Sequence, residues 1–219
     1  MRTFLLRAVK YFFFITPLWR FFLPVMKFDM TIPQLNFITN ELGLVCQEGV
    51  VIEIGVGGGS TSVMICKYMQ EFKINRKFFA IDTFYGFTKE DIAYEQEVRN
   101  KNDSYTYYRS NSKDWYKKTL IAHGINGINI FKADASSFDY SNIPQIAFCL
   151  FDVDLYKPTK AVLPILYSKL VTGGVIIVDD CSADESIYDG AGQAYREFCE
   201  ENGLTQELVH KKLGVIRKL

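Results

Sequence analysis

A glycine-rich turn beside an acidic residue is the first group of residues that could do chemistry. The segment Glu53–Ser60, with the letters EIGVGGGS, ends the β-branched run Val50–Ile54. Glycines at the carboxyl end of a first strand let the backbone approach a ligand, at the place where open α/β sheets bind their ligands. The negative charge of Glu53 disfavours a phosphate and favours a sulfonium or ammonium group. A loop that only needs positive φ would show the same glycines, so the turn alone assigns no ligand.

Two further acidic residues follow the next two strand-like runs. Asp82 closes the run Lys77–Asp82, at the spacing from the glycines at which a carboxylate accepts hydrogen bonds from ribose hydroxyls. Asp134 follows the run Ile128–Lys132, where a carboxylate could accept a hydrogen bond from an adenine amino group. A single acid at a strand end is more often a solvated cap. Acids at three successive strand ends indicate an adenosyl ligand that carries a positive charge.

A second acidic group follows the two later strand-like runs. Asp152 and Asp154 come after the fourth run, and Asp179 and Asp180 come after the fifth. Neighbouring parallel strands would bring these carboxylates together, and their repulsion in a low dielectric would favour a bound cation. Oxygen ligands without His or Cys suit Mg²⁺, Mn²⁺ or Ca²⁺ better than zinc. The alternative interpretation is that these acids cap separate loops.

Four segments together resemble a known family. They are Glu53–Gly59, Asp82–Phe87, Asp152–Tyr156 and Gly173–Asp180. These segments are similar to the macrocin O-methyltransferase (TylF-like) family, and the similarity extends over nearly all of Met30–Leu219. The chain departs from the family inside the glycine turn, where two glycines replace a bulky aromatic residue and an arginine.

This resemblance implies an activity, cofactors and site residues. It implies S-adenosylmethionine as cofactor, methyl transfer to a hydroxyl of a small-molecule acceptor such as a sugar, and a magnesium ion held at the fourth and fifth strand ends. Asp152, Asp179 and Asp180 would be the metal ligands, Asp152 would also be the catalytic base, and Asp82 would bind the ribose. The candidate cofactor-binding residues are Thr31, Glu53, Gly55, Gly57, Ser60, Asp82, Asp134 and Ala135.

The elements that must position these residues alternate between strands and helices. The expected strands are 50–54, 77–82, 128–132, 146–151 and 175–178, and the expected helices are 32–44, 62–72, 114–123, 159–170 and 191–202. Strand runs that are apolar on both faces and separated by helices predict a parallel α/β sheet. Two closing strand-like pieces, Thr205–His210 and Gly214–Lys218, predict an antiparallel C-terminal hairpin. The expected fold is therefore the Rossmann-like seven-stranded methyltransferase sheet, with helices on both faces.

The polar segment Thr88–Lys113 interrupts this alternation. It carries several tyrosines and the arginines Arg99 and Arg109. A lid that contacts substrate over the carboxyl end of the sheet and a plain solvated excursion are both open interpretations.

Composition limits the partners and the compartment. The chain has 219 residues, 48% of them hydrophobic, which suits one domain. Lys plus Arg and Asp plus Glu both number 25, so the chain lacks the basic field that nucleic-acid binding requires, and no nucleic-acid substrate is expected. Five scattered cysteines without a CxxC pair predict free thiols in a reducing compartment, hence a cytoplasmic protein.

The first residues form a segment of different character. Residues 1–29 are basic and aromatic, while residues 30–219 are expected to form the methyltransferase domain. The uncharged run Tyr11–Trp19 is too short to span a bilayer, which needs about 20 apolar residues. The segment could lie at a membrane surface or pack on its own domain or on a partner subunit. The oligomeric state stays open.

Two other classes of function would explain some of these residues, but not all of them. A nicotinamide-dependent oxidoreductase would explain the glycines and Asp82, but its fingerprint needs glycine or alanine where Ser60 stands, and it leaves Glu53 unused. A non-catalytic adenosyl-binding protein would have no reason to keep the acids. His123 and His210 lie apart from the acids, so a histidine base has little support.

Overall fold

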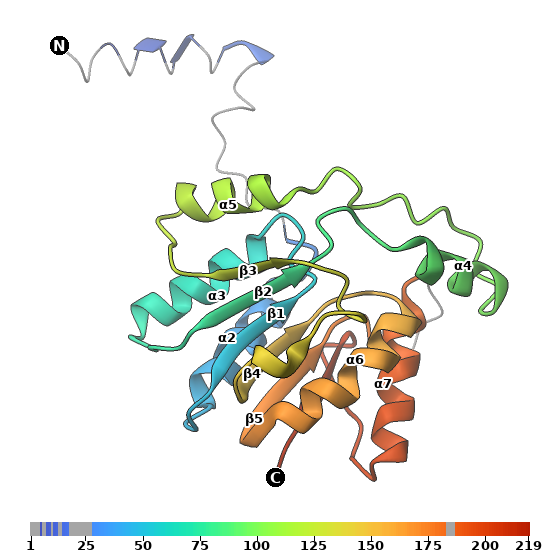
Figure 1. Ribbon diagram of the computed structural model, residues 1–219. Helices are drawn as coiled ribbons and strands as arrows, with labels where there is room; N and C mark the ends of the chain where they lie inside the picture. Colours follow the sequence, from blue (N-terminus) through green and yellow to red (C-terminus); the bar gives the residue numbers. More distant parts are fainter. Residues whose placement is uncertain (1–4, 6–7, 10, 13–14, 18–27, 183–186) are drawn as a thin grey trace.

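The strands form a single mixed sheet (Figure 1). The computed structural model describes residues 5, 8–9, 11–12, 15–17, 28–182 and 187–219. The strands are β1 Val50–Ile54, β2 Phe78–Asp82, β3 Asn129–Lys132, β4 Ile146–Phe151, β5 Leu170–Val178, β6 Glu207–Val209 and β7 Leu213–Arg217. Their order in the seven-stranded sheet is β3-β2-β1-β4-β5-β7-β6. Strands β1 to β5 are parallel, and β7 runs antiparallel to both β5 and β6, which confirms the predicted fold class.

Helices cover both faces of this sheet (Figure 1). They are α2 Ile32–Leu44, α3 Ser60–Glu71, α4 Lys89–Glu97, α5 Lys113–Ala122, α6 Tyr156–Lys169 and α7 Asp189–Glu201, with a 3₁₀ turn η2 at Tyr140–Asn142. Residues of α2, α3 and α5 belong to the hydrophobic cluster on one face, and residues of α6 and α7 belong to the cluster on the other.

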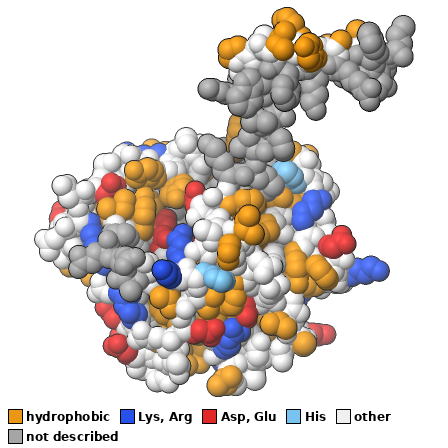
Figure 2. Space-filling view, turned by 180° about the vertical axis from the view of Figure 1, so that it is seen from behind, with side chains coloured by type: hydrophobic (Ala, Val, Ile, Leu, Met, Phe, Trp, Pro, Cys, Tyr) orange, Lys and Arg blue, Asp and Glu red, His pale blue; other side chains and the backbone are white. Residues whose placement is uncertain are grey.

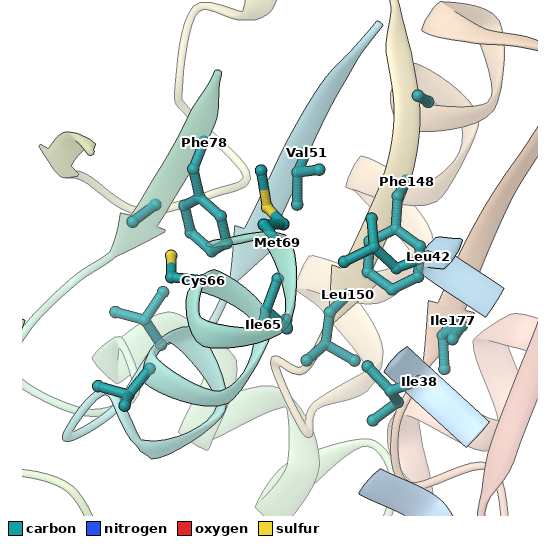
Figure 3. Packing of buried hydrophobic residues seen from close by; sticks show 14 of the residues in the cluster. Ile38, Leu42, Val51, Ile65, Cys66, Met69, Phe78, Phe148, Leu150 and Ile177 are labelled. Atoms are coloured by element: carbon teal, nitrogen blue, oxygen red, sulfur yellow. The ribbon is translucent and has the colours of Figure 1, made fainter. Parts of the chain in front are cut away.

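Alternate residues of the strands supply these two cores. In β1, Val51 belongs to the first cluster, whereas Val50, Ile52 and Ile54 belong to the second. Figure 3 shows the first cluster, where side chains of α2 and α3 pack on β1, β2, β4 and β5; the labelled residues are Ile38, Leu42, Val51, Ile65, Cys66, Met69, Phe78, Phe148, Leu150 and Ile177. Because both faces are buried, the sheet is a firm support for the loops at its carboxyl edge.

Strand β5 begins earlier than its apolar pattern predicts. It starts at Leu170 rather than Val175. Ile146 of β4 pairs with Leu170, yet the next paired residue, Phe148, pairs with Val175, so the register jumps. Gly173, at a φ of 78°, allows the irregular backbone there. Polar and glycine residues at this bulge hide the start of the strand from a hydrophobic pattern.

A helix lies inside the polar segment Thr88–Lys113. Helix α4 begins after Thr88, whose hydroxyl accepts a hydrogen bond of 3.1 Å from the backbone N–H of Asp91. The buried residues of α4 are Asp91 and Glu95, both acidic. Hydrophobic periodicity therefore gave no sign of this helix.

The surface carries charges of both signs. Figure 2 shows Lys or Arg and Asp or Glu side chains interspersed over the face seen from behind, in keeping with a formal net charge of +0. Among the described residues, no helix is long and apolar enough to cross a membrane. The prediction of a separate segment at residues 1–29 falls mostly outside the described residues. Most of those that are described, among them Leu5, Tyr11 and Ile15, are exposed, while Thr16 and Phe28 are half-buried.

Candidate active site

A cavity of about 1030 Å³, part of it open to solvent, lies at the carboxyl ends of β1 to β4. Strand β1 has β2 on one side and β4 on the other, which is the switch point where open α/β sheets bind ligands. The segments that line the cavity are 28–30, 54–58, 60–61, 81–83, 86–88, 133–135 and 152–154, together with Asp91, Tyr108, Asn111 and Pro158.

The glycine turn packs closely against the end of β4 and is hydrogen-bonded to Asp82. Gly55 has a φ of 83°, and a Cβ added there would lie 1.6 Å from the carbonyl oxygen of Asp152, so no other residue fits. The N–H of Gly57 donates to Asp82 Oδ2 at 2.9 Å, and the N–H of Phe84 donates to Asp82 Oδ1. Burial raises the pKa of Asp82, although these backbone N–H groups oppose the shift. Asp82 thus shapes the turn and also lines the cavity.

Glu53 lies behind the glycine turn rather than on the cavity wall. Its two carboxylate oxygens accept hydrogen bonds from the hydroxyls of Thr61 and Ser62 at the start of α3. The Tyr116 hydroxyl donates in turn to Ser62 Oγ at 2.9 Å. Complete burial raises the pKa of Glu53 to about 7. The structure therefore does not place Glu53 where it would touch a cationic ligand directly.

Of the other predicted cofactor-binding residues, all but Thr31 line the cavity. Those that line the cavity are Gly55, Gly57, Ser60, Asp82, Asp134 and Ala135. Thr31 does not line it and instead stands at the N-cap of α2, although its neighbours Asp29 and Met30 do.

Three carboxylates approach one another closely at the ends of β4 and β5. Asp152, Asp154 and Asp180 can each offer an oxygen such that all three oxygens lie within 4.8 Å of one another. Burial, followed by repulsion from neighbouring acids, raises the pKa of Asp152 well above its usual value. The pKa of Asp154 is raised too, by burial and by its contact with Asp180. Such a group favours a cation.

Asp179, one of the predicted metal ligands, pairs with Lys212. The predicted ligands were Asp152, Asp179 and Asp180, whereas the structure groups Asp154 with Asp152 and Asp180. Asp179 Oδ2 instead accepts a hydrogen bond of 2.8 Å from Lys212 Nζ, which also lies 3.1 Å from Asp180 Oδ1. Asp179 Oδ1 is buried without a hydrogen-bond partner among the described residues. Burial raises the pKa of Asp179 to about 6.

Sequence reasoning missed several residues of this site. Lys212 lies on the turn between β6 and β7, and no motif connected it with acids so far away in the chain. Asp154 lies in the segment Asp152–Tyr156, but the family resemblance assigns it no role as a ligand. Tyr108 and Asn111 come from the polar segment and line the cavity, so the segment does reach the site as a lid would.

Tyr108 brings an aromatic ring to the wall near the acids. Its ring meets Phe87 edge to face, with centroids 5.9 Å apart. Burial and the charges of Asp154 and Asp152 raise the pKa of Tyr108, so that its phenol stays neutral. A hydroxylated ring could rest on this wall with an oxygen toward the carboxylates.

Comparisons with solved structures agree on the fold. The O-methyltransferase NovP matches with a TM-score of 0.69 and 18% identity, over 85% of this chain and 80% of that one. The calicheamicin methyltransferase CalS11 matches with a TM-score of 0.66 and 21% identity, over 84% of this chain and 77% of that one. The apo structure of CalS11, a TDP-rhamnose 3'-O-methyltransferase, matches with a TM-score of 0.56 and 21% identity, over 84% of this chain and 78% of that one. No curated protein matches the chain in sequence.

A family comparison gives the assignment. The model of the macrocin O-methyltransferase (TylF) family matches residues 32–215, which is most of the chain. The match covers the glycine turn, Asp82 and the acids at the ends of β4 and β5, and it decides against the nicotinamide-dependent oxidoreductase. The chain belongs to the macrocin O-methyltransferase (TylF) family and is an S-adenosylmethionine-dependent O-methyltransferase.

Proposed function

We propose that this enzyme methylates a hydroxyl of a sugar or of a natural-product-like small molecule, with the help of a divalent metal ion. The observation that carries the proposal is that the glycine turn, Asp82 and the carboxylates of Asp152 and Asp154 line one cavity. A cofactor site and a proton acceptor then share one space, as methyl transfer to oxygen requires.

The cofactor residues follow from the shape of this wall. Asp82 Oδ1 accepts from the Phe84 N–H and, at 3.5 Å, from the Thr83 hydroxyl, whereas Oδ2 accepts from the Gly57 N–H. Since a carboxylate oxygen can accept more than one hydrogen bond, Oδ2 would also accept from the ribose hydroxyls. Asp134 and Ala135 lie at the end of the neighbouring strand and would hold the adenine. Gly55, Gly57 and Ser60 would let the methionyl part approach the backbone.

The acids at the ends of β4 and β5 fit a hard divalent ion. Asp152, Asp154 and Asp180 supply oxygen atoms only, and their mutual repulsion is the kind that a cation relieves. Asp179 Oδ1 is buried without a hydrogen-bond partner among the described residues, and the charge of Asp179 adds to the repulsion at Asp152. A bound Mg²⁺ or Mn²⁺ would supply a Lewis acid that lowers the pKa of the acceptor hydroxyl.

The side chains of the enzyme account for the remaining steps. Asp152 lines the cavity and lies beside Asp154 and Asp180, so its carboxylate would take the proton of an acceptor hydroxyl held there. Tyr108 and Phe87 offer ring edges and faces to the acceptor. CalS11 is a TDP-rhamnose 3'-O-methyltransferase, and its action on a sugar nucleotide supports a sugar as the acceptor class.

Two measurements test this proposal. S-adenosylhomocysteine should bind the wild type in isothermal titration, and Asp82→Ala should weaken binding by about 1–3 kcal/mol through loss of charge-assisted hydrogen bonds. Transfer of labelled methyl from S-adenosylmethionine to a panel of sugars, with TDP-rhamnose included, should need Mg²⁺ and be abolished in Asp152→Asn. Transfer that survives exhaustive chelation would show that the metal has no part in it. NADH binding without any binding of the adenosyl ligand would contradict the whole site.

A further inference from the structure

The loop that carries two of the acids is held in an unusual conformation. We call Asp152–Tyr156 the acid loop; it connects β4 to α6. Asp154 has a φ of 63°, in the left-handed region that residues other than glycine rarely adopt. Such a conformation persists only where the surroundings enforce it. The groups that enforce it therefore decide where the Asp154 carboxylate lies.

The first residues of α6 receive their cap from another helix. Leu155 is the N-cap residue, and its apolar side chain makes no capping hydrogen bond. Instead Glu95 Oε1, on α4, accepts a hydrogen bond of 2.8 Å from the backbone N–H of Tyr156. A carboxylate there also complements the positive end of the helix dipole. Glu95 is fully buried, so this contact is shielded from water.

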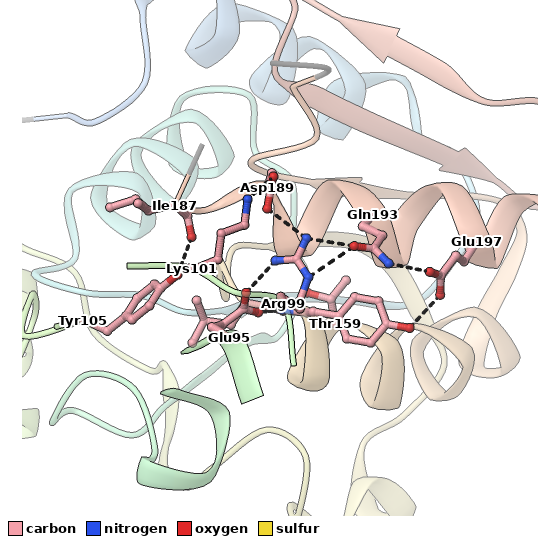
Figure 4. A network of polar contacts seen from close by, with 11 residues as sticks. Glu95, Arg99, Lys101, Tyr105, Thr159, Ile187, Asp189, Gln193 and Glu197 are labelled. Carbon is pink, nitrogen blue, oxygen red and sulfur yellow. Dashed lines mark hydrogen bonds and ion pairs between the residues drawn. The ribbon is translucent and has the colours of Figure 1, made fainter. Parts of the chain in front are cut away.

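Arg99 neutralises Glu95 and ties it to α7. Figure 4 shows Arg99 between Glu95 on one side and Asp189 and Gln193 of α7 on the other. Its Nη1 donates to Glu95 Oε2, and its Nη2 donates to Asp189 Oδ1 and to Gln193 Oε1, both at 2.8 Å. Lys101 Nζ adds a contact of 2.6 Å to Asp189 Oδ2. Two cations and two anions balance, so the cluster can stay charged while mostly buried.

Helix α7 holds the acid loop from the other side. The backbone N–H of Ala191 donates to the carbonyl oxygen of Asp154 at 3.2 Å. Gly190 permits this approach, because a Cβ there would lie 2.5 Å from the Tyr156 nitrogen and 2.8 Å from Glu95 Oε1. The acid loop is thus fixed at Asp154 by α7 and at Tyr156 by α4.

We propose that Glu95, held in place by Arg99, is a positioning residue that fixes the acid loop and so sets the place of the Asp152 and Asp154 carboxylates. Neither residue lines the cavity; Glu95 acts through the backbone N–H of Tyr156. The inference rests on the proposed function in one respect, namely that these two aspartates serve the reaction. The contact also links α4 to the acids, since Asp91 of the same helix lines the cavity.

A matched pair of double variants isolates the oxygen of Glu95. Glu95→Gln/Arg99→Met and Glu95→Leu/Arg99→Met both remove the buried ion pair, but only the first keeps an oxygen that can accept from the Tyr156 N–H. Lys160→Met is the control, because it breaks contacts between α6 and α7 at the surface, to Glu197 at 3.0 Å and Glu201 at 2.6 Å. Any general loss of stability from the ion pair is common to the two double variants.

Three readouts are measured on the full chain: hydrogen exchange of the peptide that contains residues 154–156, Mn²⁺ affinity by electron paramagnetic resonance, and S-adenosylhomocysteine affinity. Glu95→Leu/Arg99→Met should exchange faster in this peptide and bind Mn²⁺ about 10- to 100-fold more weakly, the usual effect of losing a residue that supports metal ligands. Glu95→Gln/Arg99→Met and Lys160→Met should stay near the wild type. S-adenosylhomocysteine affinity should change little in all three.

Equal exchange and equal Mn²⁺ affinity in the two double variants would overturn the inference. If the leucine variant does not fold, Gly190→Ala, which places a methyl between Glu95 and Tyr156, must speed exchange in the same peptide, and unchanged exchange overturns the inference. A wild type that binds no S-adenosylhomocysteine contradicts the proposed function instead. A wild type that binds no Mn²⁺ contradicts the metal alone, and hydrogen exchange still decides the role of Glu95.

Discussion

Lys212 places a fixed positive charge among four carboxylates. Its Nζ contacts Asp179 Oδ2 and Asp180 Oδ1, and the pKa of Lys212 is raised because these attractions outweigh the cost of its burial. A divalent ion that takes an oxygen of Asp180 would have to share that residue with the ammonium group. Lys212 and a bound metal would therefore compete for the same negative charge.

Lys212→Met should consequently bind Mn²⁺ more tightly than the wild type, by about tenfold, which corresponds to about 1.4 kcal/mol. Lys211→Met, a change at the exposed neighbour in the same turn, should leave the affinity unchanged. Titration of both variants with Mn²⁺ provides the comparison. Weaker binding in Lys212→Met would mean that the lysine orients the ligands rather than competing with the ion.

The buried carboxyl of Glu53 should make the stability of the protein depend on pH. Its pKa is about 7 in the folded protein because of burial, against an ordinary value of 4.5. Between these two values the folded state holds a proton that the unfolded state has released, so this group makes the free energy of unfolding fall as pH rises from 4.5 to about 7. Above that window the loss is constant, at about 3 kcal/mol.

Glu53→Gln keeps the shape and can still hydrogen-bond to Thr61 and Ser62, but it does not titrate. The stability of this variant relative to the wild type should rise across the window and then level off. Denaturant unfolding of both proteins at pH 5 and pH 8 measures the change, and other acids cancel in the difference. A constant difference between the two proteins at both pH values would show that Glu53 does not titrate there.

At the scale of elements, the sheet could be predicted from the sequence and helix α4 could not. Strands β1 and β4 are apolar at every position except Glu53 and are buried throughout, so a run of such residues between helices was a strong signal. Helix α4 turns Asp91 and Glu95 inward and packs on other polar groups. Its stability comes from partners such as Arg99 and Tyr156, which no periodic pattern reveals.

The candidate site could also be predicted only in part. Its acids were predictable because each lies at or just past the end of a strand, and parallel strands end at one edge. Their division into a close group and the pair Asp179–Lys212 was not predictable. It depends on side-chain directions and on a turn that is distant in the chain.

Tyr108, in the polar segment Thr88–Lys113, is expected to contact the acceptor. Tyr108 lines the cavity, whereas its neighbour Tyr107 is 55% exposed and does not. With an acceptor identified in the sugar panel, Tyr108→Leu should raise the KM for acceptor about tenfold, because a stacked ring contact is lost. Tyr107→Leu is the matched control and should behave as the wild type, and S-adenosylhomocysteine affinity should be the same in both. An unchanged KM in Tyr108→Leu would place the acceptor elsewhere on the wall.

At the scale of the whole molecule, the first segment offers a test of membrane contact. Residues 1–29 combine basic and aromatic side chains, a composition that suits the interface of an anionic membrane. If the segment lies there, the full chain should sediment with anionic vesicles and a shortened chain starting at Asp29 should not. Equal sedimentation of the two chains, with aggregation of the shortened one, would favour packing on protein instead.

The two edge strands of the sheet are short, and this affects how copies of this protein can associate. Edge strands β3 and β6 are four and three residues long, and Arg217 of the adjacent β7 pairs with Glu207 of β6. Short, charged edges offer few free amides to a strand of another molecule, so they protect against sheet extension and fibrillar aggregation. Any self-association at high concentration is therefore expected to use helical faces and to leave the sheet seven strands wide.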